Sequence, residues 1–96
     1  MRIGTVTTWP TGCDVCGQAR KVLEEAGEVV DACAVLWGAE NYGAGPSEVS
    51  AARDDLLREC ADVVQATCNL LAVLDVTDMT EAMRRCERRN RERGRL

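Results

Sequence analysis

The chain has no histidine and no phenylalanine, and only two of its 96 residues are proline. Without histidine it cannot form a Ser-His-Asp or Cys-His nucleophile system, or a histidine-ligated zinc or di-iron centre. Aromatic residues make up 3% of the sequence, namely Trp9, Trp37 and Tyr42. Because β-sandwiches and barrels rely on aromatic and turn residues, this composition argues against an all-β fold.

The sequence also lacks any run of about 18 apolar residues, so we expect no membrane-spanning helix and no membrane partner. It has no basic segment followed by an apolar segment of the kind that directs secretion, so we expect a cytoplasmic protein whose six cysteines are reduced. Cys13 and Cys16 form an isolated C-x-x-C pair, which we interpret as ordinary thiols, with a zinc or redox role as the alternative. Cys33, Cys60 and Cys68 lie in apolar stretches and are expected in the core.

Charge is unevenly distributed along the chain, whose net charge is −4. Residues 84–96 contain seven arginines and two glutamates, a net charge of +5, which leaves −9 on residues 1–83. The acidic body argues against nucleic acid as the main partner. We interpret residues 84–96 as the arginine-rich end of a C-terminal helix.

The local pattern predicts a single all-α domain over residues 1–96, beginning with an extended leader over 1–12. Three helices should follow, joined by a glycine-rich loop over 38–50 and a turn over 75–78. A domain this small buries only about 60–65% of its unfolded surface, so we expect the helical bundle to be completed by self-association into a homodimer or homotetramer. The expected helices span 14–37, 47–74 and 79–91, capped by Asp14, by Ser47, and by Asp78 or Thr77.

Acidic residues collect along one side of the first two helices. At about 100° per residue, the acids from 24 to 31 lie opposite an apolar stripe, and Glu25 lies at the boundary between them. Glu59 has the same position on the second helix, with Asp62 nearby. Antiparallel packing of the two apolar stripes brings the acidic edges together. Such acids can be solvated, can pair with arginine, or can bind a hard divalent cation such as Mg²⁺ or Mn²⁺.

Two motifs on these helices resemble those of MazG-like nucleotide pyrophosphohydrolases, which belong to the all-α NTP pyrophosphatase superfamily. Residues 24–28 resemble the family's E-E-x-x-E motif, and residues 59–62 resemble its E-x-x-D motif, in the same order. The resemblance covers residues from about 18 to 96. It implies hydrolysis of a nucleoside triphosphate to the monophosphate and pyrophosphate. It implies Mg²⁺, with Mn²⁺ as a possible substitute, bound by Glu25, Glu28, Glu59 and Asp62.

The same resemblance makes Glu24 an auxiliary acid or a water-orienting catalytic base. Several residues can contact the substrate because arginine and lysine bind phosphate and amides bind a sugar or base. The alternatives are a non-catalytic helical interaction module, and a nucleic-acid-binding accessory protein that uses the arginine-rich tail. The candidate substrate-binding residues are Lys21, Asn69, Arg88, Asn90 and Arg91.

Overall fold

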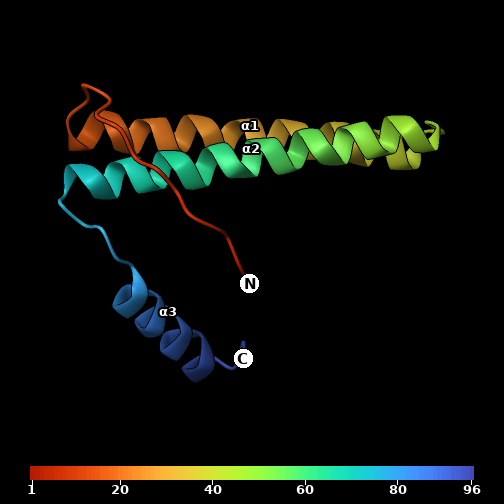
Figure 1. Ribbon diagram of the computed structural model, residues 1–96. Coiled ribbons are helices and arrows are strands. Elements are labelled where there is room, and N and C mark those ends of the chain that lie inside the picture. Colours follow the sequence, from red (N-terminus) through yellow and green to blue (C-terminus); the bar gives the residue numbers. More distant parts are fainter.

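The computed structural model describes residues 1–96 and contains three helices and no strands. The helices are α1 (Val15–Asn41), α2 (Pro46–Val73) and α3 (Thr80–Glu92). Figure 1 shows α1 and α2 side by side and antiparallel over their whole length, with α3 set apart from them. The predicted all-α class is therefore confirmed. None of the helices has the length and hydropathy that crossing a bilayer requires.

The connection between α1 and α2 is shorter than predicted. The loop expected over 38–50 is a turn over 42–45, because α1 continues through Gly38 to Asn41 and α2 begins at Pro46. A glycine inside a helix costs only about 1 kcal/mol, and proline is well suited to the first helical position, so neither residue interrupts its helix here. The predicted Ser47 cap is wrong, since Gly45 is the capping residue and supplies no side-chain bond.

The other helix ends follow local capping chemistry. Asp14 caps α1 as predicted, and its carboxylate accepts a 2.7 Å hydrogen bond from the Gly17 amide. At α3 the capping position belongs to Met79, although the Asp78 carboxylate still accepts hydrogen bonds from the amide and hydroxyl of Thr80. These bonds lower the pKa of Asp78 below its ordinary value, with the Thr80 hydroxyl the largest cause.

Residues at alternate spacings of three and four form the seam where α1 and α2 meet, which we call the inner seam. This spacing keeps one narrow face of each helix turned toward its neighbour. Every α1 member is at least partly shielded from solvent, and Ala52 and Ala66 of α2 are fully buried. On α1 the inner seam comprises Gln18, Val22, Glu25, Val29, Ala32, Leu36 and Ala39. On α2 it comprises Val49, Ala52, Leu56, Glu59, Val63, Ala66, Leu70 and Val73. Two of its members are therefore glutamates.

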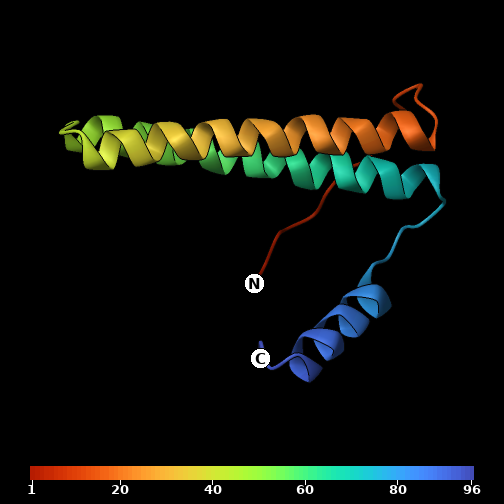
Figure 2. The same cartoon turned by 180° about the vertical axis from the view of Figure 1, so that it is seen from behind.

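The leader, residues 1–14, is extended as predicted and crosses α2 (Figures 1 and 2). Side-chain amides hold it in place at the end of the helix pair. Gln65 donates to the Thr7 carbonyl at 3.0 Å, and the Trp9 amide donates to Asn69 at 3.4 Å. Buried Gln18 accepts from the Thr11 hydroxyl at 2.8 Å and donates to a main-chain carbonyl of α2.

The cysteines do not form part of a buried core in this chain. All six are free thiols, and Cys33 and Cys60, which we expected to be buried, are exposed. Cys68 is half-buried. Cys33 and Cys60 lie on a side of the helix pair that faces away from the inner seam, so the contact between α1 and α2 does not cover them.

Candidate metal centre and adjoining cavity

Four carboxylates from α1 and α2 converge halfway along the helix pair. One oxygen from each of Glu25, Glu28, Glu59 and Asp62 lies within 4.8 Å of the others. Glu25 and Glu59 approach one another because both occupy inner-seam positions, and Glu28 and Asp62 follow each of them by one turn on the same side. The predicted convergence of these four acids is present.

One carboxylate oxygen in this group is buried without a hydrogen-bond partner. The Glu59 side chain is 19% exposed, and its Oε2 atom is buried without a donor. Its other oxygen, Oε1, lies 3.8 Å from a guanidinium nitrogen of Arg58. A buried charged oxygen without a partner is costly, and a hard cation surrounded by carboxylate oxygens would compensate this cost. The donor set therefore fits Mg²⁺ or Mn²⁺ and lacks the softer ligands that favour zinc.

A cavity of about 430 Å³ adjoins the carboxylate group on the side of the leader. Glu25 and Asp62 form part of its wall, together with Lys21, which we predicted as a phosphate ligand. Asn69, another predicted substrate contact, is in the same wall and is buried. Its Oδ1 accepts hydrogen bonds from the Trp9 amide and from Gln65, whereas its Nδ2 donates to no atom of the chain. The cavity thus combines negative, positive and amide groups.

Lys21 lies beside two of the acids. Its ammonium is 3.4 Å from Glu25 and 3.5 Å from Glu24. The hydrogen bond to Glu25 is the largest cause that raises the pKa of Lys21 above its ordinary value. Glu24, predicted as the catalytic acid or base, lies outside the four-carboxylate group and points to Lys21 from the solvent side.

The other predicted substrate contacts lie on α3. Arg88, Asn90 and Arg91 are far from the carboxylates in this chain, because α3 packs against neither α1 nor α2. Arg88 and Arg91 instead pair with Glu81 and Glu87 of their own helix. The single chain therefore brings Lys21 and Asn69 to the carboxylate group, but not the three residues of the arginine-rich helix.

Two polar residues of the cavity wall, Gln18 and Gln65, were absent from our sequence prediction. Gln18 could have been identified, because it precedes Glu25 by seven residues and so lies on the same face two turns earlier. Gln65 could have been identified in the same way, because it follows Asp62 by three residues, but its bond to the Thr7 carbonyl depends on where the leader crosses α2.

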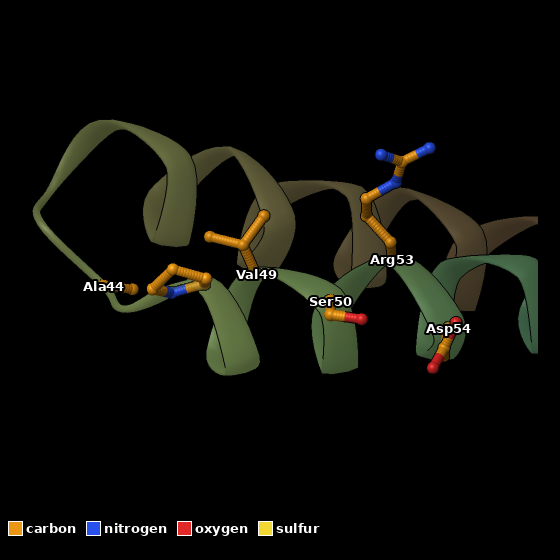
Figure 3. Close-up of a pocket in the computed structure, with 6 residues that line it drawn as sticks. Ala44, Val49, Ser50, Arg53 and Asp54 are labelled. Atoms are coloured by element: carbon orange, nitrogen blue, oxygen red, sulfur yellow. The ribbon is translucent and has the colours of Figure 1, made fainter.

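The helix pair has two further hollows, one beside the carboxylates and one at the turn between α1 and α2. On the other side of the carboxylates, Glu28 and Glu59 border a smaller cavity of about 270 Å³ that also contains Asp31, Asp55 and Arg58. A third hollow, of about 540 Å³, lies beside the turn between α1 and α2 (Figure 3).

In Figure 3, Arg53 and Asp54 project to different sides of α2, so this third hollow has no convergent charged set. The carboxylate group and its neighbouring cavity are therefore the best-organised polar site. No protein-family model, curated protein or solved structure matches this chain.

Proposed function

We propose that the protein is a divalent-cation-dependent nucleoside triphosphate pyrophosphohydrolase that releases the nucleoside monophosphate and pyrophosphate. The observation that carries the proposal is the group of four carboxylates within 4.8 Å, which contains a buried oxygen without a partner. The carboxylate group lies beside a cavity whose wall contains a lysine and a free amide donor, so the cavity has groups that can bind a phosphate and a sugar or base. The motif resemblance of residues 24–28 and 59–62 supplies the reaction class.

In this proposal, Glu25, Glu28, Glu59 and Asp62 hold Mg²⁺, or Mn²⁺ in its place. A bound Mg²⁺ would neutralise phosphate oxygens and lower the pKa of a bound water. The chain itself holds the carboxylates at fixed positions, because Glu25 and Glu59 are in the seam between two long helices. A preorganised group of this kind avoids the cost of gathering four charges when the substrate arrives.

Lys21 is the cation of the cavity that faces the triphosphate. When phosphate oxygens approach, they compete with Glu24 and Glu25 for the Lys21 ammonium. Transfer of Lys21 to the phosphates would release the Glu24 carboxylate, which could then orient the attacking water. Asn69 would use its free Nδ2 group to donate a hydrogen bond to the sugar or base.

The test is pyrophosphate release from a panel of ribo- and deoxyribonucleoside triphosphates with millimolar Mg²⁺. We expect turnover by the wild type and none by Asp62→Asn, which keeps the side-chain shape but removes a negative charge that the cation needs. Glu40→Gln is the matched control, since Glu40 is exposed on α1 outside the carboxylate group and should keep wild-type turnover.

An inactive wild type that also lacks a Mg²⁺-dependent rise in melting temperature would contradict the proposal. The separate arginine-rich helix α3 would then favour a second function, as a non-catalytic interaction module.

A further inference from the structure

Both ends of α3 are capped by the residues that flank it. At its start, the Asp78 carboxylate accepts hydrogen bonds of 2.8 and 2.6 Å from the amide and hydroxyl of Thr80. At its end, Gly94 has a positive φ of 73°, and the amides of residues 94 and 95 donate to the carbonyls of Arg91 and Asn90. This pairing is a Schellman motif, which satisfies the last carbonyls of a helix. A helix of 13 residues is marginal on its own, so these caps support α3 where it packs against neither α1 nor α2.

Arginines occupy the side of α3 that is opposite its apolar residues. At about 100° per residue, Arg84, Arg88 and Arg91 lie within about 60° of one another around the helix. Arg85 and Arg89 form a second row beside the first, one turn apart. Together these five exposed side chains form a surface that we call the arginine face. The stripe on the opposite side of the helix comprises Ala82, Met83 and Cys86.

The carboxylates of α3 leave the arginine face with an excess of positive charge. From Arg84 to Arg91 the chain has five arginines and one glutamate. Arg84 and Arg89 form no ion pair, whereas each of the other three arginines pairs with a glutamate of α3 at 3.2–3.9 Å. Those pairs join exposed side chains and are individually weak. A phosphate oxygen can therefore replace a glutamate, because guanidinium and phosphate groups form strong and often bidentate hydrogen bonds.

The acidic surface of the chain is separate from the arginine face. Residues 1–83 carry a net charge of −9, which argued against nucleic acid as the main partner when the chain was considered as one surface. In the structure, most of those acids belong to α1 and α2, and only the segment 74–79 joins α3 to them (Figures 1 and 2). Salt screens exposed charges over about 10 Å, and α3 packs against neither helix. A polyanion on the arginine face therefore avoids most of the repulsion from the helix pair.

We propose that the arginine face binds the phosphate backbone of double-stranded DNA, in contacts that carry no sequence information. DNA has one negative charge per about 1.7 Å of its length, so neighbouring arginines find several phosphates within reach. A helix with its side chains is about 10–12 Å wide and fits the major groove of B-form DNA, whereas that of A-form RNA is too narrow. The arginine face has no aromatic side chain to stack on the bases of a single strand. The opposite stripe lacks the tryptophan, phenylalanine or leucine of membrane-surface helices.

The dependence of DNA affinity on salt concentration tests this binding mode. Fluorescence anisotropy of a labelled DNA duplex of mixed sequence measures binding by the full chain in metal-free buffer. Each phosphate that an arginine neutralises contributes about −0.9 to the slope of log binding constant against log salt concentration. The five arginines predict a slope of about −4.5, so the affinity should fall about 500-fold between about 50 and about 200 mM salt.

A matched pair of double variants locates the binding surface. The double variant Arg84→Gln, Arg89→Gln removes two charges of the arginine face that form no ion pair, and glutamine has a helix propensity similar to that of arginine. Its salt slope should fall to about −2.7. The control Arg20→Gln, Arg53→Gln removes two exposed arginines of α1 and α2, and should keep the wild-type slope. Neither variant alters the carboxylate group, so the result is independent of the proposed enzymatic activity.

A wild type that does not bind the duplex at about 50 mM salt would overturn the proposal, as would equal losses of slope in the two double variants. Tighter binding to the same DNA as a single strand, or to vesicles that contain phosphatidylserine, would also overturn it. An NMR titration of the wild type locates the surface without any substitution. The duplex should shift amide signals of residues 80–95, and shifts confined to α1 and α2 would contradict the proposal.

Discussion

Replacing Glu59 by glutamine should stabilise the protein without metal and remove most of the stabilisation that metal provides. The change preserves the size of a side chain in the seam between α1 and α2. It removes one of four negative charges and replaces a carboxylate oxygen by an NH₂ group. That group can donate to the neighbouring carboxylates of Glu25, Glu28 or Asp62.

The magnitude follows from the separation of the carboxylate oxygens. Two unit charges 4.8 Å apart repel by about 3.5 kcal/mol at an effective dielectric constant of 20, and by about 0.9 kcal/mol in bulk water. Glu28 and Asp62 are exposed, so the true value for each pair lies toward the lower figure. The lost ion pair with Arg58 is worth less than about 1 kcal/mol. We therefore expect the free energy of unfolding to rise by about 1–3 kcal/mol.

The wild type should respond oppositely when Mg²⁺ is added. A native-state site stabilises by about 2.7 kcal/mol at a metal concentration 100 times its dissociation constant. For a domain of this size, that corresponds to a rise in melting temperature of roughly 10–20 °C. Without the Glu59 carboxylate, the rise should be only a few degrees. The variant should thus melt above the wild type without Mg²⁺, and this difference in melting temperature should shrink or reverse as Mg²⁺ saturates the wild-type site.

The assay is a thermal melt followed by circular dichroism, with and without Mg²⁺, at one fixed protein concentration. Glu40→Gln is the control, because it removes the same charge from an exposed site on α1. It should show the wild-type metal response. If Glu59→Gln lowered stability in metal-free buffer while keeping the full response to Mg²⁺, our assignment of Glu59 as a metal ligand would be refuted.

Three further changes test the parts of the fold that surround the site. Asp75 lies two residues beyond the end of α2 and has a positive φ of 57°, so Asp75→Gly should raise the free energy of unfolding by about 0.5–1 kcal/mol in urea titrations, and Asp75→Val should lower it. Gln18→Ala removes the acceptor of the Thr11 hydroxyl and creates a cavity beneath the leader. It should lower the free energy of unfolding by about 1–3 kcal/mol and speed amide exchange in residues 7–11. The lowered pKa of Asp78 means that the stabilisation from its hydrogen bonds to Thr80 is fully present above the unfolded value of 3.8 and is lost as the pH falls through the folded value. NMR should then detect fraying of α3 that begins at Thr80, and α3 of Asp78→Ala should fray at neutral pH.

The sequence alone determined the helices and the identity of the acidic group. Apolar residues at helical spacing predicted α1 and α2, because each must bury one face. Helix α3 buries no residue, and its prediction came from the turn and the capping residues that precede it. The same spacing placed Glu25 and Glu59 at the edge of the apolar stripes, so antiparallel packing was enough to predict that the four acids converge. Helix boundaries were less well determined, since Gly38 and Pro46 are compatible with both a loop and a helix.

Only the tertiary structure decided what surrounds that group. The leader has no periodic pattern, so its path across α2 depends on two hydrogen bonds between its backbone and side chains of α2. Gln65 bonds to Thr7 and Asn69 bonds to Trp9, and these partners are 58 and 60 residues apart in the sequence. The cavity beside Lys21 exists because of that path. The separation of α3 from the helix pair was equally invisible, because amphipathicity predicts that a face will be covered and not which surface will cover it.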